Sequence, residues 1–197
     1  MIKKKIVINN EKDLKKFYKF IKIYRYLKFL EFDSDNKEIK PIINALNIKR
    51  RNKRITYIYD YACSFIDAYW DNINYCGFKN NKCYTQQYKG CKYQNGCCRL
   101  CMYQSSKGCT TSNLTCKFYY CTEVCKHYKV LKYDDIKILK LFSLRQKVII
   151  KHSYFCSREQ ILFDLKYSGI ILYALKMFWR QIIRKRKISF KRRKKDE

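Results

Sequence analysis

Apolar residues recur at helical spacing through much of the N-terminal part of the chain, beginning with residues 11–32. Leu14 and Ile21 are seven residues apart and would share one face of a helix. Asn9 or Asn10 can cap the start of this helix, because a short polar side chain satisfies the first free N–H groups. The preceding run MIKKKIVI, residues 1–8, predicts a short edge strand.

Three further stretches complete this part of the chain. Residues 33–48 predict a shorter helix with Pro41 in its first turn, a position that tolerates the missing N–H group. The basic run KRRNKR, residues 49–54, predicts a charged loop. Residues 55–76 are apolar on nearly all sides and predict a buried helix, in which Cys63 would be a small hydrophobic residue.

Helical patterns return near the C-terminus, with residues 134–142 and 143–152 as two candidate helices. Ser157 and Gln160 form an S-x-x-Q capping box that opens one long predicted helix. On that helix an apolar face and a basic row lie on different sides. The apolar face consists of Ile161, Leu165, Leu172, Leu175, Trp179 and Ile182, and the basic row of Lys176, Arg180, Arg184 and Lys187.

The middle of the chain has no such periodicity. Eleven of the twelve cysteines and four of the five glycines lie between residues 63 and 125. A chain of 197 residues is long enough for one core or for two small lobes. We therefore predict a mostly α protein in which two helical parts, residues 1–75 and 128–197, flank an irregular, metal-stapled, cysteine-rich segment, residues 76–127.

Eight cysteines in this segment are candidate ligands of zinc or of an iron–sulfur cluster. Thiolates three or four residues apart, as in Cys98-x2-Cys101 and Cys121-x3-Cys125, can reach one metal ion, and sulfur-only ligation suits both kinds of site. His127 could replace one thiolate. Disulfides or inert thiols are the alternatives to metal ligation. The candidate ligands are Cys91, Cys97, Cys98, Cys101, Cys109, Cys116, Cys121 and Cys125.

Residues 90–121 resemble the bacterial cysteine-cluster proteins that chelate zinc or iron. Adjacent Cys97 and Cys98, followed by Arg99, match the double-cysteine element of that family, and Cys91 takes the place of an upstream ligand. Cys91 lacks the paired C-x-x-C spacing, and the downstream proline-containing element is absent. The resemblance covers less than a fifth of the chain and implies metal chelation.

The formal net charge of +29 predicts a polyanionic partner. We expect nucleic acid ahead of an anionic membrane, which a basic amphipathic helix with Trp and Phe could also bind. A solvated basic tail, and lysine enrichment from A/T-rich codons, are the alternatives. The candidate contacts in the two arginine-rich clusters are Arg50, Arg51, Arg54, Arg180, Arg184, Arg186, Arg192 and Arg193.

No motif for a familiar catalytic site is present. The sequence lacks a P-loop, G-x-G-x-x-G, H-E-x-x-H and the C-x3-C-x2-C pattern of radical enzymes. His152 fits an ordinary helix end, and Cys156 a buried thiol.

No secretory signal or spanning helix is evident, so we expect a cytoplasmic protein. The leading hypothesis is a non-enzymatic metal-binding protein that binds nucleic acid. The alternatives are an iron–sulfur redox enzyme or electron carrier, and a peripheral membrane protein.

Overall fold

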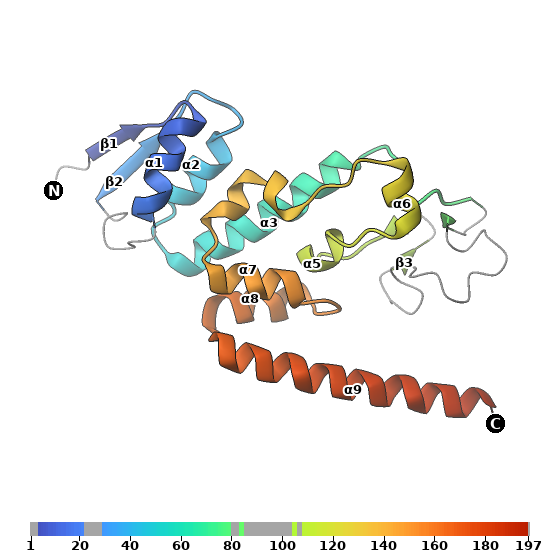
Figure 1. Cartoon of the computed structure of the whole chain (residues 1–197). Helices are drawn as coiled ribbons and strands as arrows, with labels where there is room; N and C mark the ends of the chain where they lie inside the picture. Colours follow the sequence, from blue (N-terminus) through green and yellow to red (C-terminus); the bar gives the residue numbers. More distant parts are fainter. Residues whose placement is uncertain (1–3, 22–28, 80–82, 85–103, 106–107, 197) are drawn as a thin grey trace.

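The computed structural model describes residues 4–21, 29–79, 83–84, 104–105 and 108–196. Helix α3, Arg51–Tyr69, runs through the middle of the molecule (Figure 1). The N-terminal elements gather at one end of α3, short helices lie near its other end, and the C-terminal helices lie beneath it. The prediction of a mostly helical protein is confirmed.

The N-terminal elements form a β–α–β unit followed by a helix. Strand β1, Lys4–Val7, pairs in parallel with β2, Leu30–Asp33, and α1, Glu11–Ile21, lies between them in the chain. Parallel pairing needs such a crossover. The Asn10 side chain accepts from the Asp13 backbone N–H at 2.9 Å, so the predicted cap is confirmed.

The predicted helix over residues 11–32 is wrong at its end, because residues 30–33 are strand β2. The burial of this strand alternates, with Phe32 3% exposed between exposed Glu31 and Asp33. A period of two residues is the pattern of a strand. In the sequence, the helical spacing of the apolar residues ahead of it hides this alternation.

Helix α2, Lys40–Asn47, begins with Pro41 in its first turn, as predicted. The predicted loop over residues 49–54 is wrong from Arg51 onward, where α3 begins. Basic residues disfavour a helix N-terminus electrostatically, so their charge pointed to a loop. Helix α3 ends at Tyr69, short of the predicted residue 76, and Asn72 in the following turn has a positive φ of 61°.

The next elements are short. Strands β3, Gln104–Ser105, and β4, Gly108–Cys109, are antiparallel, and helices α5, Leu114–Lys117, and α6, Thr122–His127, follow. The helix predicted over residues 134–142 is replaced by two 3-10 turns, η3, Tyr133–Asp135, and η4, Lys137–Leu141. Ile136 between them has extended backbone, which interrupts the helix, and its side chain is 2% exposed.

The C-terminal part contains α7, Leu144–His152, α8, Arg158–Tyr167, and α9, Ile170–Asp196. The capping box that opens α8 is confirmed, and His152 ends α7 as expected. The single long helix predicted from Ser157 is wrong. The backbone at Ser168 is extended, and the chain turns back so that α9 runs along the molecule beneath α8 (Figure 1).

A single cluster of buried side chains links these elements, from Ile8 near the N-terminus to Tyr173 in α9. Tyr59 of α3 is fully buried at its centre, where its hydroxyl donates to the Ser112 carbonyl and accepts from the Leu114 N–H, both at 3.0 Å. Cys63 and Cys156 are buried in this core, as predicted.

Candidate functional site

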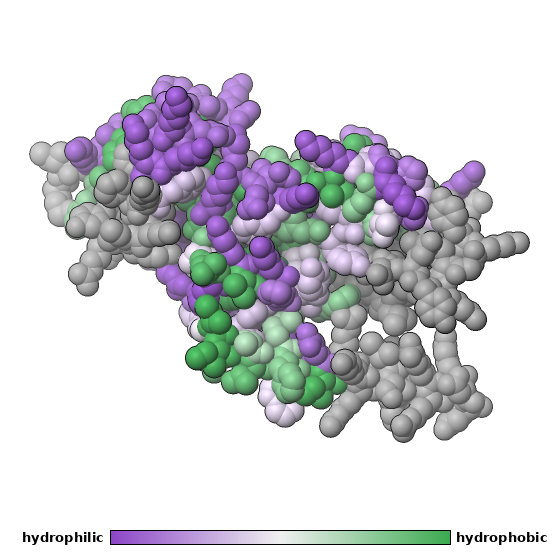
Figure 2. Space-filling view, in the orientation of Figure 1, coloured by the Kyte–Doolittle hydropathy of each residue, from purple (hydrophilic) through white to green (hydrophobic). Residues whose placement is uncertain are grey.

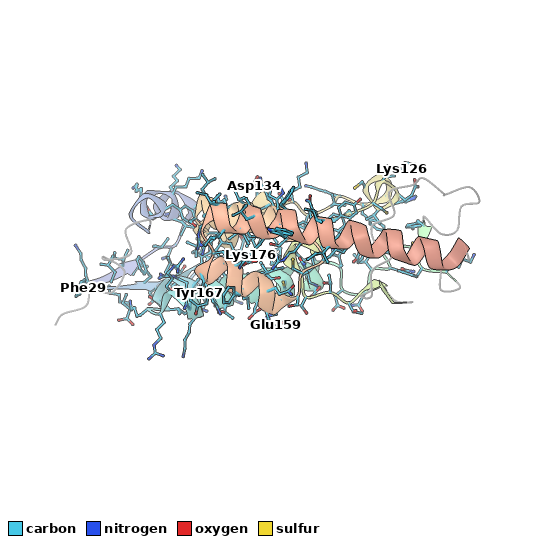
Figure 3. All side chains as sticks on the ribbon, turned by 90° about the horizontal axis from the view of Figure 1, so that it is seen from below. Phe29, Lys126, Asp134, Glu159, Tyr167 and Lys176 are labelled. Carbon is cyan, nitrogen blue, oxygen red and sulfur yellow. The ribbon has the colours of Figure 1, made fainter. Side chains whose placement is uncertain are left out.

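Helices α8 and α9 meet through polar side chains. Asp164 of α8, with a side chain 1% exposed, accepts from Ser168 Oγ at 2.6 Å. It also accepts from Lys176 Nζ at 2.7 Å and lies 3.4 Å from Arg180 Nη1, and both cations belong to α9. Seen from below, Lys176 lies between the two helices (Figure 3). The buried carboxylate therefore holds the basic side of α9 against the body of the protein.

Tyr173 is the point where α9 enters the hydrophobic core. It is 3% exposed, and its hydroxyl lies 2.8 Å from Ser153 Oγ and 3.2 Å from the Ile149 carbonyl oxygen. Burial raises the pKa of Tyr173 to about 12, so the hydroxyl stays protonated at neutral pH. Tyr173, Lys176 and Arg180 follow one another at three- and four-residue steps and form the inward side of α9.

The rest of the α9 surface carries large apolar residues, and these are exposed. Figure 2 shows hydrophobic side chains gathered over this region of the molecule. We call these residues the α9 outer face. They are Ile170 (49% exposed), Ile171 (77%), Leu172 (61%), Leu175 (53%), Phe178 (60%), Trp179 (61%) and Ile183 (51%).

The predicted apolar face is therefore not continuous across α8 and α9. Ile161 and Leu165 of α8 are fully buried as a core face should be, whereas Leu172 and Trp179 point away from the core. The break at Ser168 separates the two halves of the predicted apolar face. Lys176 and Arg180, two members of the predicted basic row, face inward toward Asp164.

The arginines of the cluster at the start of α3 have different surroundings. Arg50 is exposed. Arg51 is exposed and donates to the Lys166 carbonyl at 2.9 Å. Arg54 is 6% exposed and donates to the Ile48 carbonyl at 3.3 Å, so its guanidinium lies against the fold. Of the C-terminal cluster, the structure describes only the backbone at four positions, which are Arg184, Arg186, Arg192 and Arg193.

The predicted metal ligands are described only in part. Four of them lie outside the described residues, and only the backbone of Cys109 is described. The four are Cys91, Cys97, Cys98 and Cys101. Within the described residues, no three His, Cys, Asp or Glu side chains gather closely enough to hold a metal ion. Metal ligation by the full set stays a prediction.

Three predicted ligands lie on or beside the short helices of this region. Cys116 in α5 is half-buried, and its Sγ accepts from the Phe155 N–H at 3.5 Å. Cys121 is buried at the start of α6, and Cys125 is exposed one turn later. The Cys125 N–H donates to the Cys121 carbonyl at 3.1 Å, so both residues belong to one helical turn.

Two cysteines that we did not predict as ligands approach the same end of the molecule. The backbone N–H of Tyr84, next to Cys83, donates to the Cys76 carbonyl at 3.0 Å. The Tyr84 ring stacks on His127 at 4.8 Å between centroids, which brings this loop beside α6. In the sequence, the density of cysteines around residues 76–125 was the available signal for including Cys76 and Cys83.

Comparison of the chain with protein-family models, with curated proteins and with solved structures gives no match. Among the described residues, no helix combines the length and the apolar character that crossing a bilayer requires.

Proposed function

We propose that the protein binds the surface of an anionic membrane through the α9 outer face. The observation that carries this proposal is the orientation of α9. Its cations Lys176 and Arg180 face a buried carboxylate, while its apolar residues face outward. Contiguous exposed apolar surface marks an interaction site in most proteins. An amphipathic helix lying in the plane of a membrane buries such a face at the boundary between headgroups and acyl chains.

The composition of the face favours lipid over phosphate as its immediate contact. The side chains of Ile171 and Leu172 can form neither a hydrogen bond nor an ion pair with a phosphate group. Burying each of them away from water is favourable by about 1.5–3 kcal/mol. Trp179 and Phe178 suit the interfacial zone, where aromatic rings accumulate. The basic sequence from Arg184 onward continues the same helix and would attract anionic headgroups at about 1 kcal/mol for each cation.

Charge also favours a membrane over a second copy of the chain as the partner of this face. Each chain carries a formal charge of +29, so pairing two copies brings like charges together. An anionic bilayer instead offers opposite charge and apolar volume at one surface. The same charge supports nucleic acid as a partner of the arginine-rich clusters, and that role stays a prediction.

Trp179 provides a direct test. The chain has two tryptophans, of which Trp70 is 7% exposed and Trp179 61% exposed. Mixing the protein with vesicles of phosphatidylserine and phosphatidylcholine should shift the emission of Trp179 to shorter wavelength, as its ring leaves water. Vesicles of phosphatidylcholine alone should give a much weaker shift, because they lack the attracting charge.

A matched pair of leucines supplies the control. Leu172→Gln on α9 should lower the affinity for anionic vesicles about tenfold or more, because one buried leucine side chain is lost from the membrane. Leu144→Gln on α7, where the leucine is 76% exposed, should leave that affinity unchanged. Equal affinities of both variants and the wild type would refute the membrane proposal.

Metal binding by the cysteine-rich segment is a separate proposal that does not depend on α9. It is supported by the density of thiols and by the resemblance of residues 90–121. Elemental analysis and a visible absorbance scan of anaerobically purified protein distinguish zinc from an iron–sulfur cluster. Protein that contains no metal and is fully folded would exclude this role and the iron–sulfur redox alternative.

A further inference from the structure

A second surface, on α3 and the end of α8, combines stacked aromatic rings with cations. Tyr57, Tyr61 and Phe65 lie one helical turn apart on α3. The ring centroids of Tyr57 and Tyr61 are 6.3 Å apart with planes inclined by 23°, and those of Tyr61 and Phe65 are 6.3 Å apart with planes inclined by 34°. We call these three residues the α3 aromatic row. Because successive ring planes are inclined by similar small angles, the three rings form a continuous row along the helix.

The first two rings of the row line an open groove of about 520 Å³ between α3 and the end of α8. Lys53 of α3 and Lys166 of α8 also line this groove, together with the polar side chains of Asn52, Thr56 and Ser64. The groove therefore offers flat aromatic faces, positive charge and hydrogen-bonding groups within one volume.

An acidic residue in the same groove is already neutralised. Asp60 accepts from Arg158 Nε at 2.7 Å and from Arg158 Nη2 at 2.6 Å, a bidentate pair. The Asp60 carboxylate raises the pKa of the Arg158 guanidinium, which stays charged. Because Arg158 pairs with Asp60, the Asp60 carboxylate does not cancel the positive charge that Lys53 and Lys166 bring to the groove.

We propose that this groove binds single-stranded nucleic acid, with bases stacking on the α3 aromatic row and phosphates meeting Lys53 and Lys166. Aromatic platforms beside a basic track are the recurring construction of single-strand binding sites, because every base has a face that can stack. A duplex hides those faces within its own stack. The proposal concerns residues other than the two arginine-rich clusters, and it does not depend on membrane binding by α9.

The test measures binding of the full-length protein to a dye-labelled single strand and to a hairpin duplex of the same base composition, by fluorescence anisotropy. Tyr57→Leu/Tyr61→Leu should weaken single-strand binding roughly five- to 150-fold for each stacked base lost. Hairpin binding, which depends on overall charge, should remain as in the wild type. Tyr57→Phe/Tyr61→Phe keeps the stacking faces and should retain single-strand affinity.

Two matched controls separate the groove from general effects of composition. Tyr119→Leu/Tyr154→Leu removes a contacting pair of exposed tyrosines elsewhere and should leave single-strand binding unchanged. Lys53→Ala/Lys166→Ala should weaken that binding more than Lys37→Ala/Lys129→Ala, which removes the same charge from exposed sites elsewhere.

RNA and DNA strands are titrated separately, and at least one must show the loss in Tyr57→Leu/Tyr61→Leu. Wild-type affinity of this variant for both strands would overturn the proposal, as would an equal loss for the hairpin or in the Tyr119→Leu/Tyr154→Leu control. Leu172→Gln should not change single-strand binding, and the groove variants should not change vesicle binding. The outcomes for the two surfaces are therefore distinguishable.

Discussion

Helices α8 and α9 are neighbours in the chain with similar content of apolar residues, yet they present those residues in opposite directions. Ile161 and Leu165 of α8 are fully buried, whereas Leu172 and Leu175 of α9 are 61% and 53% exposed. The difference follows from where charge is satisfied. Asp164 on α8 is buried and needs cations, and Lys176 and Arg180 of α9 supply them while the apolar residues of α9 stay exposed.

The contrast shows that a buried charge can set the orientation of an amphipathic helix. An unpaired carboxylate in a core is strongly destabilising, so the cations of α9 turn inward. Each large apolar side chain left in water forgoes about 1.5–3 kcal/mol. The α9 outer face therefore retains a favourable free energy of transfer that an apolar partner can release. If α9 were turned the other way, its apolar residues would already be buried in the core, and no such free energy would remain for a partner.

The largest expected effect comes from removing the cations that fix this orientation. Lys176→Met/Arg180→Met leaves the Asp164 carboxylate buried without a countercharge. We expect the free energy of unfolding to fall by about 3–5 kcal/mol, measured by urea denaturation. Adding Asp164→Asn to this variant removes the uncompensated charge and should recover part of the loss. A double variant as stable as the wild type would show that charge pairing does not hold α9.

The two apolar faces can be compared directly by truncating one leucine on each. Leu165→Ala on α8 creates a cavity in the core and should destabilise the protein by about 2–5 kcal/mol. Leu172→Ala on α9 should change stability by no more than about 0.5 kcal/mol, as expected of an exposed site. Similar losses in both variants, measured by thermal unfolding, would contradict the assignment of an exposed face to α9.

The sequence predicted the helical class and several element starts, because these depend on local patterns. The Ser157–Gln160 capping box and Pro41 act within one turn, and both were recognised from spacing alone. Strand β2 was missed because its pairing with β1 is a contact between distant segments. The inward direction of Lys176 was missed for a similar reason, since helical periodicity separates two faces of a helix without saying which face meets the core.

The candidate sites also have some features that the sequence shows and others that only the folded chain shows. The density of cysteines is visible in the sequence, but the approach of the Tyr84 loop to His127 depends on the folded chain. The α3 aromatic row is visible at four-residue spacing within residues 55–76. The apolar pattern predicted these rings as part of a buried helix, and only the folded arrangement places Tyr61 in a groove with Lys166.

Thiol reactivity should report how firmly α9 is held. Cys156 is 3% exposed, its Sγ lies 3.2 Å from Arg180 Nη1, and burial raises the pKa of its thiol more than Arg180 lowers it. A raised pKa means a smaller thiolate fraction at neutral pH, so alkylation by iodoacetamide should be slow in the wild type. In Lys176→Met/Arg180→Met the release of α9 should make it faster.

Cys63 supplies the reference for that measurement. It lies in α3, and burial raises its pKa to about 12, so its thiol should stay unreactive as long as the core is folded. Mass spectrometry of the alkylated peptides then distinguishes local release of α9 from global unfolding. Equal acceleration at Cys63 and Cys156 would mean that α9 does not detach by itself.

The smallest expected effect concerns the junction between the two helices. The Gly169 carbonyl accepts from the Tyr173 N–H at 2.9 Å, so Gly169 caps the start of α9, and a Cβ atom there would meet nothing within 4 Å. Serine is a better N-cap than glycine, and Gly169→Ser should raise the free energy of unfolding by a few tenths of a kcal/mol. Gly77→Ser is the opposite case, because Gly77 has a φ of +59° and its Cβ would overlap the Tyr84 ring. That variant should be clearly destabilised in the same thermal unfolding assay. A loss of stability in Gly169→Ser would mean that α9 does not begin at Ile170, and the separation of α8 from α9 would need revision.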